Sequence, residues 1–237
     1  NADQIYTDMM ILDPKEKTSK MSVMIAAAKK DMIDERVHFL KEINIQPDFI
    51  TLNPIALANV INVLGLQIKG DNVLPVKKNE AVAIVDVGEQ ITNVSIISAG
   101  LPRFTRDIFA AGSDFTKHLS TTLGVSLEEA ERLKCNPGAR KDEILKACES
   151  VFLNLVSDMR LSFDYFVTEH NMPITRILLG GGASRLEGMT EFLASCFEIE
   201  IERWNPFHHV EVPAEQKQEI ETVSGQLGVA LGLALYG

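Results

Sequence analysis

The sequence lacks the features that mark secreted, membrane-spanning and nucleic-acid-binding proteins. Its three cysteines, Cys135, Cys148 and Cys196, lie far apart and form no Cys-x-x-Cys pair, so we predict reduced core thiols and neither disulfides nor a zinc site. The longest apolar run, 227–236, is too short for a membrane helix and is interrupted by two glycines, so we expect no direct membrane insertion. A net charge of -10 without a basic stripe argues against nucleic acid as a partner.

The overall composition is that of an ordinary globular protein. With 237 residues, 46% hydrophobic and 24% charged, the chain can form one sizeable core or two smaller ones. The stretch 65–80 reads as a linker because it combines glycines, a proline and a polar run. We therefore predict an N-terminal piece over residues 1–64 and a second lobe over 81–237, with a helical subdomain at about 113–172.

The residue pattern of the N-terminal piece predicts a small α/β arrangement. Residues 5–12 and 21–28 read as two strands of a hairpin, and helical spacing of apolar residues begins at Lys30. A short strand is expected at 49–52, followed by a helix with Asn53 as its N-cap. The apolar face of that helix is Leu57, Ile61 and Leu64.

The central stretch, 82–116, carries the most chemical information. An apolar strand ends in Asp86-Val87-Gly88, and a β-branched strand resumes at Thr92. A fixed carboxylate, a glycine that admits a ligand, and a hydroxyl on one loop fit a magnesium phosphate site. On this motif alone, an ordinary hairpin turn is the alternative.

Two predicted helices follow the central stretch. Ser113 is expected to cap a helix that Gly124 ends, and Ser126 with Glu129 has the spacing of a capping box. The second helix places Glu131 and Lys134 three residues apart on one face, where a surface ion pair is the simplest reading.

The pattern of residues 142–236 predicts a helix, a glycine loop and a closing segment. Residues 142–169 repeat apolar side chains every three or four positions, which is typical of a packing face. After a strand at 174–179, the glycines at 180–182 precede a predicted helix at 185–197, an arrangement that can cradle phosphate or sugar. A strand at 198–202 and one helix at 214–236, with a glycine stripe for close packing, complete the expected elements.

The ordered series Asp86-x-Gly88, Thr92-Asn93, Arg106, Ala111-Gly112 and Thr116 resembles the second phosphate motif of actin-like ATPases, and most closely that of the PilM family of type IV pilus assembly. The resemblance implies an α/β actin-like ATPase fold, which is ribonuclease H-like, with a complete second lobe. The N-terminal piece would be the end of an inserted subdomain and the return helix of the first lobe.

The resemblance also assigns the site. Glu131 and Lys134 match the Glu-x-x-Lys helix that contacts adenine and ribose, and Asp86 would hold Mg²⁺. The sequence departs from the family pattern at Ala111, where a glycine is usual, and at Gly180, where a hydroxyl residue is usual. The residues expected to bind ATP are Asp86, Gly88, Thr92, Gly112, Glu131, Lys134, Gly181, Gly182 and Ser184.

The family's first Asp-x-Gly turn, which clamps the β- and γ-phosphates, does not precede Asp86 in this sequence. Phosphoryl transfer depends on charge placed on both sides of the γ-phosphate, so we expect no appreciable ATPase activity from this chain alone and at most a weak ATPase in the complete protein.

Four functions remain open. The first is a nucleotide-responsive scaffold of the pilus machinery. The second is an FtsA-like cell-division adaptor, which would need an amphipathic membrane helix beyond Gly237. The third is a small-molecule kinase, for which no general base stands out. The fourth is a pseudo-ATPase that binds no nucleotide.

The resemblance finally implies the partners. A PilM-like protein is cytoplasmic and held at the inner membrane by the cytoplasmic tail of a PilN-like membrane protein. We expect that tail to bind a groove involving the first lobe, between the inserted subdomain and the nucleotide core, because an open strand edge attracts an extended chain. Other pilus assembly components and self-association are further expected contacts.

Overall fold

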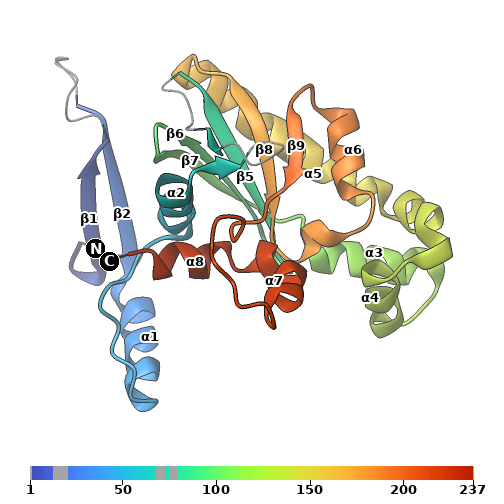
Figure 1. Cartoon of the computed structure of the whole chain (residues 1–237), viewed down its shortest axis with the longest axis horizontal. Helices are drawn as coiled ribbons and strands as arrows, with labels where there is room; N and C mark the ends of the chain where they lie inside the picture. Colours follow the sequence, from blue (N-terminus) through green and yellow to red (C-terminus); the bar gives the residue numbers. More distant parts are fainter. Residues whose placement is uncertain (1, 13–20, 68–72, 75–78, 237) are drawn as a thin grey trace. The chain divides into compact units, whose positions relative to one another are not determined.

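The computed structural model describes residues 2–12, 21–67, 73–74 and 79–236, which form two compact units, Asn1–Thr51 and Leu52–Gly237 (Figure 1). The first unit contains η1 (Ala2–Gln4), β1 (Ile5–Ile11), β2 (Val23–Lys29) and α1 (Lys30–Glu42). The second contains α2 (Asn53–Leu64), β3 (Leu66–Gln67), β4 (Val73–Leu74), β5 (Ala81–Val87), β6 (Thr92–Ser98), β7 (Leu101–Ile108), α3 (Gly112–Leu123), α4 (Leu127–Cys135), η2 (Gly138–Arg140), α5 (Lys141–His170), β8 (Ile174–Gly180), η3 (Ala183–Arg185), α6 (Met189–Cys196), β9 (Glu200–Arg203), α7 (Lys217–Val223), η4 (Ser224–Gln226) and α8 (Gly228–Ala234).

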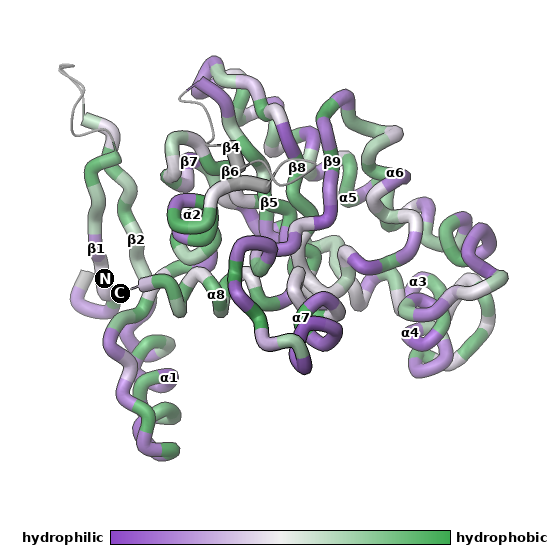
Figure 2. Tube along the Cα trace, viewed as in Figure 1, coloured by the Kyte–Doolittle hydropathy of each residue, from purple (hydrophilic) through white to green (hydrophobic). Residues whose placement is uncertain are grey.

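The first unit is a hairpin with one helix. β1 and β2 pair antiparallel, from Ile5 opposite Lys29 to Ile11 opposite Val23. The Tyr6 hydroxyl donates a hydrogen bond to Asp34 of α1 at 3.0 Å, which fixes the helix against one face of the hairpin. Figure 2 shows β2 coloured hydrophobic along nearly all of its length. The predicted hairpin and helix are confirmed, with ends displaced by at most two residues.

Residues 49–52, predicted to form a strand, have no regular secondary structure. A strand is stable only beside another strand that satisfies its backbone groups, and none in the described part of the chain pairs with this stretch. The next element, α2, begins at Asn53 with Leu52 as its N-cap, one residue earlier than predicted. The predicted division of the chain at 65–80, part of which lies outside the described residues, stays a prediction.

The second unit is built on a five-stranded sheet in the order β7-β6-β5-β8-β9. β5 is antiparallel to β6 and parallel to β8, so it lies at the centre of a mixed sheet. Its uninterrupted apolar run follows from this position, because a central strand is buried on both faces. Parallel pairing also places Asp86 opposite Gly180 at the carboxyl ends of β5 and β8.

The alternating side chains of β5 serve two different cores. Ala83 and Val85 belong to a large core formed with α3, α4, α5 and α6. Val82 and Ile84 belong to a smaller core on the opposite face with Leu57 and other residues of α2. Helices therefore cover both faces, which leaves the strand ends as the place where polar side chains can gather.

Two helix starts differ from expectation in detail. α3 begins at Gly112, and the Asp114 carboxylate, rather than Ser113, caps it by accepting the Ala111 N–H at 3.0 Å. The Ser126 hydroxyl caps α4 as predicted, by accepting the Glu129 N–H at 3.1 Å. The Glu129 carboxylate binds Arg132 instead of completing the capping box, since the guanidinium offers two charge-assisted donors.

Two long helices predicted from the sequence are broken. The expected helix at 185–197 divides into η3 and α6, because Gly188, immediately before α6, adopts a φ of 91° that a helix cannot contain. The expected helix at 214–236 divides into α7, η4 and α8. At the second break the Gly225 carbonyl accepts the Gly181 N–H at 2.7 Å. In a continuous helix this carbonyl would instead accept an N–H of its own helix.

The glycines of the closing segment do allow close packing, as predicted. A Cβ at Gly228 would lie 2.9 Å from Trp204, and one at Gly232 would lie 2.0 Å from the Ala56 carbonyl oxygen of α2. The Asn59 amide donates to the Gly232 carbonyl across the same interface. α8 thus packs directly on the backbone of α2. Among the described residues, no helix has the length and apolarity needed to cross a membrane.

Candidate functional site

The site is organised around the carboxyl ends of β5 and β8. Asp86 is half-buried at the end of β5, and the glycine loop after β8 passes directly over its side chain. A Cβ added at Gly181 would lie 2.5 Å from the Asp86 Oδ1 atom and 2.3 Å from the Val87 carbonyl oxygen. Gly181 has a φ of 82°, a conformation that side chains disfavour. Only glycine therefore brings this loop so close to the carboxylate.

The Asp86 carboxylate can accept a cation. Burial raises its pKa, and no charged neighbour in the described residues contributes to that shift. No cluster of three or more metal-binding side chains exists among those residues either. Mg²⁺ is commonly held by one or two carboxylates together with phosphate oxygens and water, so a single carboxylate at a strand end fits this ion when a nucleotide supplies the phosphates.

The raised pKa of Asp86 gives a testable pH dependence. An acid whose pKa is higher in the folded state lowers stability once it ionises, so the free energy of unfolding should fall as pH rises through this range. We expect Asp86→Asn to unfold at a higher temperature than wild type at pH 7, with the difference narrowing as pH falls and Asp86 becomes protonated. Thermal melts followed by circular dichroism from pH 4 to pH 8 would measure it. A difference that stays constant with pH would contradict the assignment.

Gly88 and Gly112 bring the turn after β5 against the start of α3. The Gly112 N–H donates to the Gly88 carbonyl at 2.9 Å, and the Ser113 N–H donates to the Glu89 carbonyl at 2.6 Å. A Cβ at Gly112 would lie 3.1 Å from the Ala183 Cβ atom of the glycine loop. Three loops that are distant in the sequence therefore meet at Gly112.

Two predicted ligand hydroxyls already have partners within the protein. Thr92 is fully buried, and its hydroxyl donates to the Ala110 carbonyl at 2.7 Å. The buried Ser184 hydroxyl donates to the Gly181 carbonyl, also at 2.7 Å. Both side chains hold loops of the site in place. Their direct contact with a nucleotide stays a prediction.

Lys134 is the centre of a buried hydrogen-bond network. Its side chain is only 9% exposed, and its ammonium donates to the Gly112 carbonyl at 3.0 Å and to the Thr116 hydroxyl at 2.8 Å. It also forms an ion pair with Glu131 at 2.6 Å. An ammonium has three N–H donors, and these three contacts use them all. The interpretation of Glu131 and Lys134 as a simple surface pair is therefore wrong for Lys134.

Glu131 is the more accessible member of the pair. Its side chain is 50% exposed, and its carboxylate also accepts the Thr116 hydroxyl. Burial alone would raise its pKa, but the hydrogen bonds from Lys134 and Thr116 outweigh burial and lower it. Glu131 thus stays ionised at neutral pH and can accept hydrogen bonds from a ligand.

Lys134 and the glycine loop line the same cavity, of about 330 Å³. This volume is at the lower end of the range for small-molecule sites, roughly 300–1,000 Å³. Gly182 contributes to the wall, and a Cβ there would lie 3.4 Å from the Gln226 side chain. The lining residues are Lys134, Cys135, Asn136, Gly182, Ala183, Arg185, Leu186 and Gln226.

Sequence reasoning missed three polar residues of this cavity, Asn136, Arg185 and Gln226. Gln226 follows the Gly225 that bonds to the glycine loop, and Arg185 donates to the Thr222 carbonyl in the same closing segment. The glycine stripe near the end of the chain was the available signal, because it showed that this segment packs closely on something. No local pattern identified the glycine loop as its neighbour.

Cys135 also lines the cavity and is exposed, so the prediction that all three cysteines are core thiols is wrong for this one. Burial of its sulfur and the neighbouring Glu131 carboxylate raise the pKa of the Cys135 thiol. A protonated thiol is a poor nucleophile, so this environment does not activate Cys135 for nucleophilic chemistry.

Solved structures with the same arrangement of elements identify the class. The chain aligns with the PilM-PilN type IV pilus biogenesis complex with a TM-score of 0.80 and 24% identity, over 98% of this chain and 66% of that one. It aligns with MreB 5 of Spiroplasma citri bound to AMPPNP with a TM-score of 0.61 and 12% identity, over 88% of this chain and 65% of that one. The protein has an actin-like ATPase fold, as predicted.

The sequence gives the particular family. The family described as Type IV pilus assembly protein PilM matches residues 1–237, so the chain belongs to it. The cell division protein FtsA of Bacillus subtilis (strain 168) is 37% identical over 76 residues, which is 30% of this chain and 17% of FtsA. The chain thus spans about two thirds of the PilM-PilN chain that it matches and a much smaller part of FtsA.

Proposed function

We propose that the protein is a nucleotide-binding scaffold of type IV pilus assembly at the inner membrane. The observation that carries the proposal is the meeting of the Asp86 strand end, the Gly112 turn and the glycine loop beside the cavity that Lys134 lines. These elements come from three separate parts of the sequence. Their convergence supports one ligand that has both phosphates and a flat apolar group, such as ATP.

Each element would have a separate task in binding. The Asp86 carboxylate would hold a hydrated Mg²⁺ bound to the phosphates, which lowers their repulsion. Gly181 and Gly182 would let the phosphates or ribose approach the backbone. Glu131 would accept a hydrogen bond from the ribose, while Lys134 fixes the carboxylate.

The partner is proposed from the same family. The similarity to the PilM-PilN type IV pilus biogenesis complex supports a PilN-like partner. We propose that the cytoplasmic tail of such a membrane protein binds the first-lobe part of the protein. Such a tail would bring the protein to the membrane surface. Other assembly components and self-association remain further proposed contacts.

Isothermal titration with ATP and ADP, each with Mg²⁺, tests the nucleotide site. We expect saturable binding of both with phosphate release near background. Glu131→Ala should weaken binding about tenfold, or ~1.4 kcal/mol, since a hydrogen bond to a charged group is lost. Glu128→Ala, an exposed glutamate on the same helix, is the matched control and should bind as wild type. Equal losses in the two variants would remove Glu131 from the site.

A pseudo-ATPase scaffold is the second candidate, and specific contacts favour it. The three donors of Lys134, the hydroxyl hydrogen of Thr92 and the amide of Gly112 are all used within the protein. A folded wild-type protein that shows no saturable binding of ATP or ADP would select this function. The scaffold role and the PilN-like partner would then remain without nucleotide control.

A further inference from the structure

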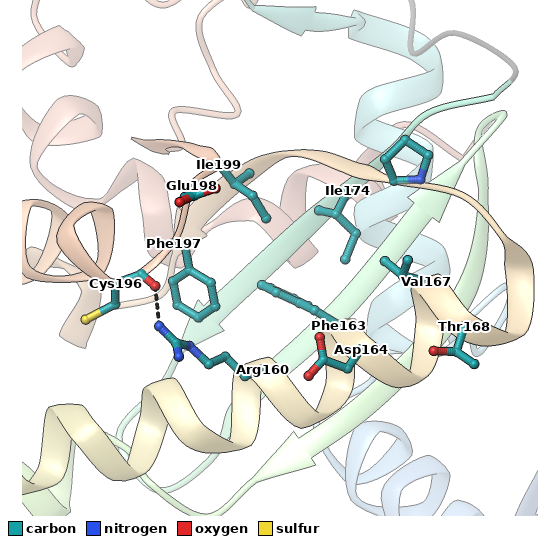
Figure 3. A pocket seen from close by; sticks show the side chains of 11 residues that line it. Arg160, Phe163, Asp164, Val167, Thr168, Ile174, Cys196, Phe197, Glu198 and Ile199 are labelled. Carbon is teal, nitrogen blue, oxygen red and sulfur yellow. Dashed lines mark hydrogen bonds between the residues drawn. The ribbon is translucent and has the colours of Figure 1, made fainter.

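A second and larger cavity, of about 630 Å³, lies on a different part of the second unit (Figure 3). It is a groove between the C-terminal half of α5 and the chain that connects α6 to β9. It shares no lining residue with the cavity around Lys134. The proposed nucleotide site therefore gives no explanation for it.

The floor of the groove is apolar. The Phe163 ring packs against the Phe197 ring with centroids 5.5 Å apart, and Figure 3 shows both rings directed into the space between α5 and the sheet. Ile174 extends the floor of the groove. Val167 of α5 also lines the groove and is 41% exposed. A groove of this size and composition can bury one or two large apolar side chains of a partner.

The charges around the groove are unbalanced. Among the described residues, Arg160 is the one cation that lines the groove; its guanidinium donates to the Cys196 carbonyl at 2.5 Å and lies over the Phe197 ring, and neither contact neutralises its charge. Asp164 from α5 and Glu198 from the facing connection are both exposed. No cation forms an ion pair with either carboxylate within the described residues. The rim thus presents two carboxylates and one guanidinium, which leaves an excess of negative charge, and no described residue holds either carboxylate in an ion pair.

We propose that this groove binds a segment of a partner protein in which an apolar anchor side chain stands next to lysine or arginine. The apolar floor would take the anchor, and Asp164 and Glu198 would pair with the flanking cations. Phosphate-bearing ligands, including nucleic acids and anionic lipids, would be repelled by the same carboxylates. A second copy of the chain is disfavoured by its net charge of -10.

Shift mapping by ¹H–¹⁵N NMR with a synthetic peptide, acetyl-Ser-Lys-Leu-Phe-Arg-Ser-amide, tests the proposal. We expect perturbations centred on residues 160–168 and 196–199, and binding that weakens as salt is added. The double variant Asp164→Asn/Glu198→Gln should lower the affinity about two- to tenfold, the effect of losing two exposed ion pairs. A peptide with glutamate in place of lysine and arginine should not bind.

Glu149→Gln is the matched control, since Glu149 is an exposed carboxylate on α5 outside the groove. The proposal would be overturned by equal binding of the acidic peptide, by an equal loss of affinity in Glu149→Gln, or by perturbations elsewhere. Sedimentation that shows dimers abolished by the double variant would assign the groove to a second copy instead. A titration with ATP and Mg²⁺ on the same sample tests the nucleotide site separately from the groove. Peptide binding without nucleotide binding would contradict only the nucleotide site.

Discussion

Replacing Gly181 with alanine is expected to destabilise the protein by about 2–5 kcal/mol. Part of this cost is backbone strain, roughly 1–3 kcal/mol for a side chain forced into a left-handed conformation such as the φ of 82° found here. The rest is collision, since the new methyl group would lie 2.3 Å from the Val87 carbonyl oxygen and 2.5 Å from Asp86. Urea unfolding followed by fluorescence would measure the loss.

The adjacent glycine is the control for this experiment. Gly182 has a φ of -65°. A Cβ added there would have the Gln226 side chain as its nearest neighbour, at 3.4 Å, which is an ordinary contact distance. Gly182→Ala should therefore unfold within about 0.5 kcal/mol of wild type. If the two variants unfold at the same urea concentration, the close approach of the loop to Asp86 is not the reason for glycine at 181.

Replacing Lys134 with methionine should have the next largest effect, a loss of roughly 1–3 kcal/mol. Methionine keeps most of the apolar packing of the stem but leaves the Gly112 carbonyl and the Thr116 hydroxyl without their charged donor. Glu131 is half exposed, so water can replace part of its contact and the cost stays below that of a fully buried pair. Urea unfolding would report the stability, and hydrogen exchange should rise in residues 112–117.

The pH dependence of this variant follows from Glu131. The hydrogen bonds that lower the pKa of Glu131 below its usual 4.5 stabilise the fold above that pH, and this contribution disappears as pH falls through the lowered value. The difference between wild type and Lys134→Met should therefore shrink in acid. Lys117→Met, at an exposed lysine 3.9 Å from Asp114, is the control and should change stability by no more than about 0.5 kcal/mol. Similar losses in both variants would show that Lys134 is not the centre of a buried network.

Much of the fold could be predicted because local patterns determine it. The apolar run before Asp86 marked a strand buried on both faces, and the periodicity of 142–169 marked the long helix, found as Lys141–His170. The actin-like fold was predicted from the resemblance of the phosphate and glycine motifs, in their order along the chain, to those of actin-like ATPases. These features depend on residues close in the sequence, whose spacing is matched to one secondary structure.

Other features depend on contacts between distant segments, and these were predicted wrongly or not at all. The helix expected at 214–236 is broken where the Gly225 carbonyl accepts the Gly181 N–H, a contact that the local pattern could not show. The helix expected at 185–197 is broken at Gly188, whose φ of 91° is not helical. The strand expected at 49–52 has no strand beside it in the described residues. Local propensity is a weak preference, and a backbone contact made elsewhere in the fold outweighs it.

The candidate site divides in the same way. The sequence alone determined which residue types were present: a carboxylate at a strand end, glycines where a ligand could approach, and Glu131 with Lys134 on one helix face. Only the tertiary structure decided that Lys134 is buried with all of its donors in use, and that Gln226 lies against Gly182. The physical reason is that burial and hydrogen-bond partners arise from packing between segments, and these set whether a polar group is available to a ligand or already committed to the fold.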